Sequence, residues 1–200
     1  ANKIGKKILM SGGGRCNFTN QFVEADNFIS DNPHFCKSAL STYTQWDFID
    51  LVEQHHIEYE ERKHGQLFCV HSAKDIVAML KTECELSGVE IKTHCEVNNV
   101  ASSESDAHGN SYRLEIAQGA SEPRATLTTS CHSLVIASGA LSVPTLGGSG
   151  IGYEIAKQFK LEVTDLRSGL VPFMFSDFMK PLCERLSGSS LEVEIRCNGR

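Results

Sequence analysis

The sequence predicts a mixed α/β fold, and three stretches carry that prediction. Residues 72–91 contain a capped amphipathic helix, then a glycine and then a short apolar segment, which is the order of a helix–turn–strand unit. Residues 96–129 alternate between half-apolar extended segments and polar turns (102–110 and 119–124), as in an antiparallel meander. Residues 133–137 (Ser-Leu-Val-Ile-Ala) form a continuous apolar run of strand length, typical of a strand buried on both faces. We therefore expect an α/β framework with an inserted antiparallel meander.

The remaining elements are read from caps, periodicity and turn residues. We expect a helix from Pro33 to about Leu40, a helix over 44–54, a hairpin of 57–59 with 66–69 turning at Gly65, and a helix over 153–159. The pattern of residues along the sequence changes near residue 168, and segments 171–175 and 191–195 have the composition of strands. The chain should thus divide into residues 1–168 and residues 169–200, the second part opening a mainly β domain.

Composition narrows the classes of function. The 200 residues suffice for one domain or slightly more, with 40% hydrophobic and 22% charged residues. The formal net charge of −6 argues against nucleic acid as a partner. No apolar run reaches membrane-spanning length, and no signal peptide is visible. The eight cysteines include no C-x-x-C pair, which favours reduced thiols in a cytoplasmic protein over a zinc site or a disulfide framework.

The segment from residue 11 to residue 20, Ser-Gly-Gly-Gly-Arg-Cys-Asn-Phe-Thr-Asn, is the first candidate for chemistry. Three glycines leave the main chain open to close approach, and polar side chains surround them. Exposed N–H groups followed by the guanidinium of Arg15 suit a phosphate or pyrophosphate. The competing interpretation is a flexible polar loop without a ligand.

The second candidate is the apolar run with its continuation, Val-Ile-Ala-Ser-Gly-Ala over 135–140 and the glycine-rich stretch 147–153. Small residues after a buried strand allow the main chain to approach a ligand, although a plain strand-to-loop exit has the same composition. The glycines of 147–152 do not fit G-x-G-x-x-G, because Tyr153 falls at the last glycine and Pro144 follows the strand.

Residues 6–20 (Lys-Lys-Ile-Leu-Met-Ser-Gly-Gly-Gly-Arg-Cys-Asn-Phe-Thr-Asn) closely resemble the signature of the HI0933-like NAD(P)/FAD-dependent oxidoreductases of bacteria. The resemblance extends in order through Asp-Asn-Pro at 31–33, His-Gly-Gln-Leu-Phe at 64–68 and Leu-Val-Pro at 170–172. Residues 135–140 also resemble the Ala-Thr-Gly-Gly strand end of two-dinucleotide flavoproteins. Two departures are visible: Ser138 stands where Thr is usual, and Ala140 where the second Gly is usual.

The resemblance implies a Rossmann-like FAD-binding domain in an FAD-dependent oxidoreductase. It implies hydride or electron transfer between a nicotinamide cofactor, NAD(P)H, and a small-molecule substrate. No nucleic acid, membrane or metal is expected as a partner, and no side chain stands out as a catalytic acid or base. The residues expected to bind the cofactor are Ser11, Gly12, Gly13, Gly14, Arg15, Cys16, Asn17, Thr19, Asn20, Val97, Ala137, Ser138, Gly139, Gly150, Gly152 and Tyr153.

Two features limit what the chain is expected to do by itself. The strand, G-x-G-x-x-G and ribose-binding acid that usually open such a domain are absent, as is its C-terminal return, so the chain resembles an internal part of a longer flavoprotein. Residues 1–200 alone should then be inactive, bind FAD weakly or not at all, and be prone to associate. The alternatives are a fragment that binds only phosphate or a nucleotide without catalysis and, less well supported, a phosphohydrolase, for which the Gly-Lys-Ser/Thr motif is missing.

Cysteine and histidine chemistry is expected to be minor. Cys16 has no cysteine partner a few residues away, so a small packing residue beside the cofactor is a better interpretation than a redox dithiol. His55 and His56 end a helix and His71 borders a cap, and no set of residues has metal-ligand spacing.

Overall fold

The computed structural model describes residues 2–102, 111–141, 148–168, 174–189, 192–194 and 196. The chain divides into two compact units, Ala1–Glu162 (unit 1) and Val163–Arg200 (unit 2). The sequence placed this division slightly later, between residues 168 and 169.

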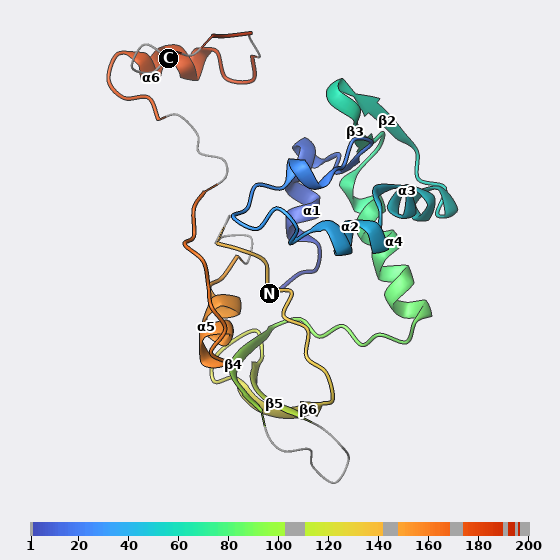
Figure 1. Cartoon of the computed structure of the whole chain (residues 1–200), viewed down its shortest axis with the longest axis vertical. Coiled ribbons are helices and arrows are strands. Elements are labelled where there is room, and N and C mark those ends of the chain that lie inside the picture. Colours follow the sequence, from blue (N-terminus) through green and yellow to red (C-terminus); the bar gives the residue numbers. More distant parts are fainter. Residues whose placement is uncertain are drawn as a thin grey trace. The chain divides into compact units, whose positions relative to one another are not determined.

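Unit 1 combines short helices with two three-stranded sheets (Figure 1). Its first elements are α1 (Lys6–Met10), the 3-10 turn η1 (Ser11–Gly14), β1 (Asn17–Asn20), η2 (Ala25–Asn27), α2 (Lys37–Thr42), α3 (Gln45–Gln54), β2 (Tyr59–Arg62), η3 (Lys63–Gly65), β3 (Gln66–Cys69) and α4 (Ala73–Leu86). Its later elements are β4 (Cys95–Ser102), β5 (Tyr112–Gln118), β6 (Ala125–Cys131) and α5 (Ile151–Gln158).

The first sheet has β3 at its centre, with β1 and β2 antiparallel on either side. The predicted hairpin is confirmed as β2–β3, although β2 begins at Tyr59 rather than at residue 57. Arg62 pairs with Gln66 across the turn, and Gly65 completes the turn with φ +72°, a region that glycine enters without a steric penalty. The last three residues of β3 are buried, so the central strand carries the core of this half of the unit: Leu67, Phe68 and Cys69.

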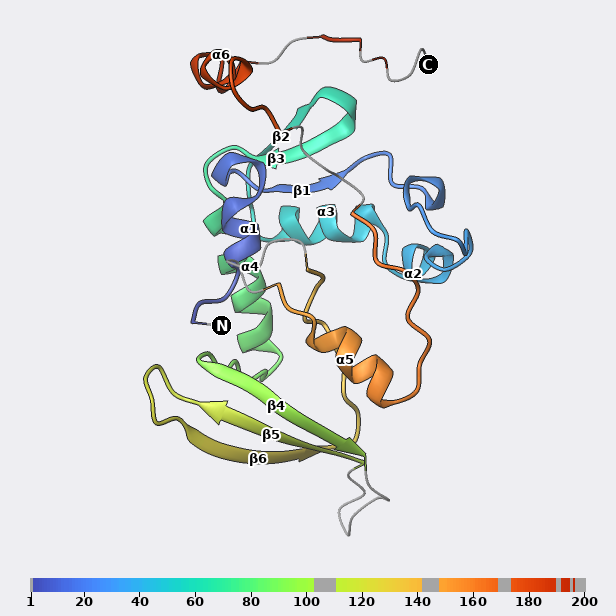
Figure 2. The same cartoon turned by 90° about the vertical axis from the view of Figure 1, so that its left-hand side faces the viewer.

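Two of the predicted helices pack on this sheet. Thr44 caps α3, and Ser72 caps α4 by accepting a hydrogen bond from the Lys74 amide at 3.1 Å. Gly88, with φ +69°, follows the end of α4. Figure 2 shows α3 running along β1 and α1 beside α4, in agreement with the contacts between them. The shared core consists of Cys16, Val52, Cys69, Ala73, Ile76 and Met79.

The predicted antiparallel meander is confirmed as β4–β5–β6. Val100 of β4 faces Leu114 of β5, and both side chains are buried. Helix α5 covers this sheet (Figure 2): the side-chain amide of Gln158 donates to the Val100 carbonyl, and the Tyr112 and Phe159 rings lie 6.2 Å apart between centroids. The predicted helix over 153–159 is thus confirmed, with its start two residues earlier.

Two predicted strands are wrong. Residues 89–91 form no strand, and Val89 and Ile91 are exposed. Residues 133–137 belong to no strand of the described part, and Val135 is 84% exposed. The physical reason is that an apolar run becomes a strand only beside free N–H and C=O groups of another strand. The strands described in unit 1 pair only within the two antiparallel sheets.

The helix expected from Pro33 begins later, as α2 at Lys37. The carboxamide oxygen of Asn32 accepts a hydrogen bond from the His34 amide at 3.0 Å, and the Asn32 carbonyl accepts one from the Phe35 amide at 3.1 Å. These bonds close turns instead of a helical ladder, as asparagine side chains often do.

Unit 2 is described over fewer residues. Helix α6 (Met179–Arg185) is its helix within those residues. Of the strands expected over 171–175 and 191–195, residues 171–173, 191 and 195 lie outside the described part, and residues 174–175 and 192–194 are described without belonging to a strand. The mainly β second domain stays a prediction. The polar turn expected over 102–110 lies outside the described part except for residue 102. Pro144 and Gly147 lie outside it as well. No helix in the described part of the chain is both long and apolar enough to cross a bilayer.

Replacing the cap of α3 should measurably destabilise unit 1. Thr44→Ala removes the hydroxyl that accepts from the Asp47 amide at 3.3 Å and contacts the Asp47 carboxylate at 2.6 Å. We expect the free energy of unfolding, measured with urea, to fall by about 1 kcal/mol. Thr82→Ala, on the exposed face of α4, should change it by less than about 0.5 kcal/mol. Equal effects of the two substitutions would contradict the capping role.

The effect of Thr44→Ala should also depend on pH. Hydrogen bonds from the Thr44 hydroxyl and then the Thr44 amide hold the pKa of the Asp47 carboxyl below its usual range. The ionised carboxylate therefore stabilises the fold above its ordinary pKa, and this contribution is lost as the pH falls through the lowered value. The difference in stability between the wild type and Thr44→Ala should shrink in acid.

Candidate functional site

A hollow beside the meander contains three of the residues expected to bind a cofactor. The meander hollow has a volume of about 750 Å³ and lies where the first part of β4, the turn after β5 and the start of α5 meet. Val97, Ser138 and Gly150 line it. Its remaining lining residues are Asn2, His94, Cys95, Glu96, Gly119, Ala120, Arg124, Ser149, Ile151 and Glu154.

Two glycines keep the main chain at the edge of this hollow open. Gly139 has φ +76°, and a Cβ atom there would lie 3.5 Å from the Lys7 ammonium nitrogen of α1. A Cβ atom at Gly152 would lie 3.0 Å from the Ser138 hydroxyl, so this glycine lets the first turn of α5 approach residue 138 closely. The positive φ falls on Gly139 and not on Ala140, so the replacement of the usual second glycine by Ala140 introduces no left-handed backbone.

Charged groups of both signs line the meander hollow. The Arg124 guanidinium pairs with Glu96 across the sheet and with Glu122 of its own turn, in the second case at 3.0 Å from Nε to Oε1. Glu154 stands in the first turn of α5. Arg124 in this hollow is thus already paired with carboxylates. The lining also includes hydroxyl groups, main-chain groups and the first turn of a helix, and together these suit a polar ligand.

The triple glycine forms a left-handed turn whose members differ in their surroundings. Gly12, Gly13 and Gly14 all have positive φ, at 57°, 66° and 87°. A Cβ atom at Gly12 would lie 2.7 Å from both the Asn17 amide nitrogen and the Phe68 ring, so no side chain fits here, although the glycine itself is exposed. No atom of the described residues lies within 4 Å of a Cβ placed at Gly13. A Cβ atom at Gly14 would meet only the Leu9 carbonyl oxygen, at 4.0 Å, so the main chain is open to a ligand at Gly13 and nearly as open at Gly14.

Several polar side chains of this segment are engaged within the protein. The Ser11 hydroxyl donates to the Ile8 carbonyl at 2.7 Å, and the Asn20 amide donates to the His64 carbonyl at 2.8 Å. The Arg15 guanidinium lies 3.4 Å from Glu60, and both side chains are roughly half exposed. A hydrogen bond from Arg62, with a smaller contribution from the nearby Arg15, holds the pKa of the Glu60 carboxyl below its usual range.

Asn17, Thr19 and Asn20 belong to β1, whose register with β3 contains a bulge between residues 17 and 19. Cys16 is only 4% exposed and lies in the core, so it packs as expected, while its place beside a cofactor stays a prediction. Ala137 is exposed, and Tyr153 is partly buried in the first turn of α5.

The structure thus gathers part of the predicted set. Val97, Ser138 and Gly150 share the meander hollow, with Gly139 and Gly152 at its edge, whereas residues 11–20 do not line it. The two candidate segments approach each other where Lys7, just before the triple glycine, lies beside Gly139. A shared cofactor site therefore stays a prediction.

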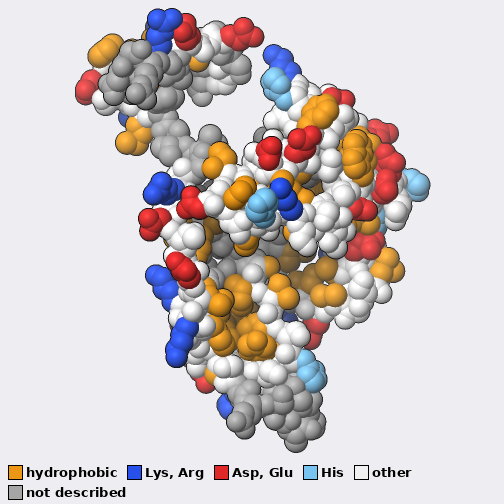
Figure 3. All heavy atoms as spheres, in the orientation of Figure 1, with side chains coloured by type: hydrophobic (Ala, Val, Ile, Leu, Met, Phe, Trp, Pro, Cys, Tyr) orange, Lys and Arg blue, Asp and Glu red, His pale blue; other side chains and the backbone are white. Residues whose placement is uncertain are grey.

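Sequence reasoning missed Arg124 and Glu96 as lining residues. The hairpin pairing could have found them: Cys95 pairs with Gln118, so the turn after β5 must lie at the same end of the sheet as the start of β4. Figure 3 shows hydrophobic side chains gathered over this region of the meander.

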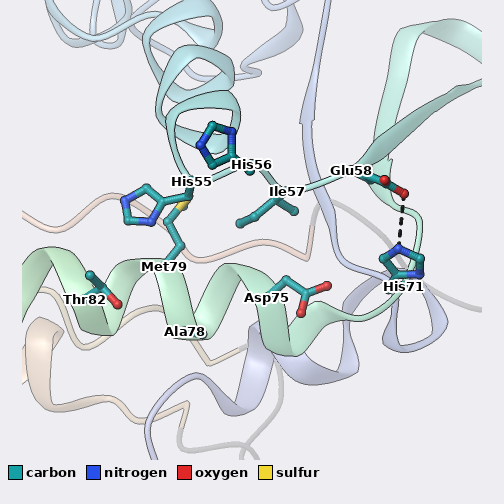
Figure 4. A pocket seen from close by; sticks show the side chains of 9 residues that line it. All are labelled: His55, His56, Ile57, Glu58, His71, Asp75, Ala78, Met79 and Thr82. Carbon is teal, nitrogen blue, oxygen red and sulfur yellow. Dashed lines mark hydrogen bonds and ion pairs between the residues drawn. The ribbon is translucent and has the colours of Figure 1, made fainter.

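A second hollow, of about 440 Å³, lies between the end of α3, the start of β2 and α4 (Figure 4). His55 pairs with Glu83 at 2.6 Å, and His71 with Glu58 at 3.2 Å. Figure 4 shows His56 near the end of α3 and Asp75 on α4 facing the same space. Among the described residues, no three histidine, cysteine, aspartate or glutamate side chains are arranged to hold a metal ion.

Comparison with known proteins gives the class of this domain. Residues 1–180 match the family model of the HI0933-like protein Rossmann domain. The fold is accordingly a mixed α/β Rossmann-like domain with antiparallel sheets. The chain belongs to the HI0933-like family, as its signature around the triple glycine predicted.

Two bacterial proteins share about half of their aligned residues with this chain. The chain is 51% identical over 184 residues to the ribosomal RNA dihydrouridine synthase of Escherichia coli strain K12, a match that covers 92% of this chain and 42% of that protein. It is 45% identical over 193 residues to the protein of the same name from Haemophilus influenzae, covering 96% of this chain and 46% of that protein. The 3-dehydro-bile acid delta(4,6)-reductase of Clostridium scindens is 26% identical over 155 residues, covering 77% of this chain and 34% of that protein. The chain therefore spans less than half the length of these relatives.

The expectation of a small-molecule substrate and no nucleic-acid partner is wrong in its second part. The two most similar of these relatives are named for ribosomal RNA. The expectation rested on a net charge of −6, which averages over the whole chain. Contact with RNA depends on local groups, and base stacking on aromatic rings needs no positive charge.

The core thiols should resist alkylation. Burial raises the pKa of the Cys69 thiol to about 11, and the neighbouring Cys16 and Asp75 add to the effect. Because the thiolate is the reactive form, iodoacetamide at pH 8 should leave Cys69 unlabelled in the folded protein, and burial should shield Cys16 from the reagent. Both should be labelled in urea. The partly exposed Cys84 serves as the control. Labelling of Cys69 as fast as Cys84, measured by peptide mass spectrometry, would contradict the packing role.

Proposed function

We propose that this chain is part of an FAD-dependent oxidoreductase that reduces uridine in ribosomal RNA to dihydrouridine. The observation that carries the proposal is the 51% identity, over 92% of this chain, with a protein named for that activity. The 45% identity with a second protein of the same name supports it. The activity belongs to the whole protein, to which these residues contribute, and a cytoplasmic location follows from a ribosomal substrate.

The reaction balances with a nicotinamide cofactor as reductant. Bound FAD would supply the hydride carrier between NAD(P)H and the substrate. For each uracil ring, one hydride and one proton add across the C5–C6 double bond, and NAD(P)H becomes NAD(P)⁺. The bile-acid relative is named for reduction of double bonds in a 3-dehydro compound, so both names describe reduction of a carbon–carbon double bond in a ring system that carries a carbonyl group.

The residues of this chain fit a binding and orienting role toward FAD. At Gly13, the space that a Cβ atom would occupy has no neighbouring atom of the described residues within 4 Å, and Gly139 combines positive φ with exposure. Both would let the main chain approach an extended dinucleotide closely. Val97, Ser138 and Gly150 would hold one end of the cofactor in the meander hollow, whose volume of about 750 Å³ is ample for part of a dinucleotide.

The intact protein should purify yellow and release FAD on denaturation. Supplied with NADH or NADPH and ribosomal RNA from cells that lack the enzyme, it should form dihydrouridine, measured by mass spectrometry of the digested RNA. A colourless intact protein that takes up no added FAD would contradict the cofactor. A flavin-loaded protein that leaves the RNA unchanged would contradict the substrate.

The triple glycine offers a matched pair of substitutions. Gly13→Ala and Gly88→Ala place a methyl group at nearly the same positive φ, 66° and 69°, and neither meets an atom within 4 Å. Both should therefore cost a similar amount of stability, about 1–2 kcal/mol. Only Gly13→Ala should reduce FAD content, measured as flavin absorbance per protein, because the methyl group stands where the cofactor approaches. Equal FAD content in the two variants would show that the main chain at Gly13 is not a cofactor contact.

A further inference from the structure

We propose that Phe22 and the hairpin tip η3 form a stacking site for an unpaired base of the RNA substrate. This inference rests on the proposed function, because the occupant is RNA, and it adds a binding site separate from the cofactor residues. Four features of the described residues carry it: the exposure of the ring, its fixed position, the nearby cationic side chains and the link to the triple glycine.

The Phe22 ring is held on one side and open over most of its surface. It is 66% exposed, yet a Cβ atom at Gly65 would lie 2.6 and 2.7 Å from two of its ring carbons. The ring therefore rests on the main chain of Gly65, which only a glycine allows. An aromatic ring supported from behind and exposed in front is the geometry on which proteins stack single-stranded bases.

A set of hydrogen bonds fixes the chain around this ring. The Asn20 side chain donates to the His64 carbonyl and accepts from the Phe22 amide, both at 2.8 Å. The Gln21 amide donates to the Gly65 carbonyl at 2.9 Å, and the Gln45 side chain donates to the Gln21 carbonyl at 3.1 Å. The position of Phe22 is thus determined before any ligand arrives, which lowers the entropic cost of binding.

The hairpin tip adds a cationic lysine and an exposed imidazole near the ring. Lys63 and His64 are exposed, and neither forms an ion pair with another residue in the described ranges. Arg62 is already engaged, by Glu60 at 2.7 Å and by the Phe68 ring, whose centroid lies 4.3 Å from its guanidinium carbon. One lysine at the tip favours a phosphate near the stacked base but predicts a shallow dependence on salt, consistent with an acidic chain.

The first sheet joins this site to the segment proposed to contact FAD. Phe68 packs against Gly12 of the triple glycine on one side and carries Arg62 on another. Strand β1 runs from just after the triple glycine to Asn20, beside the hairpin tip, a length of roughly 13 Å at 3.3 Å per residue. A base on Phe22 would therefore belong to a nucleotide near the one presented to the cofactor.

The test uses the intact protein and a short fluorescein-labelled oligouridylate, with affinity measured by fluorescence anisotropy. Phe22→Leu keeps an apolar side chain but removes the π face, and Phe22→Trp enlarges it. We expect Phe22→Leu to weaken binding roughly five- to 100-fold and Phe22→Trp to retain or strengthen it. Lys63→Ala should weaken binding more modestly and flatten the salt dependence further.

Two controls make the result specific. Phe35→Ala removes another exposed ring, in the turn before α2. Lys74→Ala removes another exposed lysine, on α4. Both should leave binding unchanged, and FAD content should be the same in all variants. Unchanged affinity in Phe22→Leu, with RNA reduction intact in the wild type, would overturn this inference alone. So would a lowered melting temperature without a loss of affinity, because the ring would then pack against another part of the protein. A wild type that neither binds nor reduces RNA would overturn the proposed function as well.

Discussion

The packing of Gly12 against the Phe68 ring is the contact on which the arrangement of the candidate site depends. Any side chain at position 12 would meet the Asn17 amide and the ring at 2.7 Å, so the turn must sit directly on the central strand β3. A Cβ atom at the neighbouring Gly13 would meet no atom of the described residues within 4 Å, so its main chain is open. The same ring carries Arg62, so the triple glycine, β3 and the hairpin tip behave as one body. The buried Leu67 and Cys69 on either side of Phe68 fix that body to the core.

Elements with local signals were predictable from the sequence. The Thr44 and Ser72 caps, the glycine after α4 and the alternation in the meander each reflect interactions within a few residues, and the corresponding helices and strands formed. Elements that need distant partners were not. The apolar run 133–137 has strand composition, but no described strand lies alongside it. The helix expected from Pro33 does not begin there, and the reason is local. The Asn32 side chain accepts a hydrogen bond from the His34 amide, and such bonds compete with helix initiation.

The candidate site shows the same division. The glycine-rich segments were found because glycine at positive φ leaves a composition signal, whereas Arg124 and Glu96 reach the meander hollow only through strand register. Net charge excluded nucleic acid wrongly because it sums over the whole chain and carries no information about local groups. In this chain, carboxylates already hold Arg15, Arg62 and Arg124, and the exposed Phe22 ring rests on Gly65 at the hairpin tip. The stacking site proposed above would recognise RNA through bases rather than through phosphates.

We expect the triple glycine and the meander hollow to contribute to one FAD site in the whole protein. A crystal structure of the intact protein with bound FAD should show the cofactor in contact with the main chain at both Gly13 and Gly139, with one end near Val97 and Ser138. A cofactor bound away from both segments would contradict it.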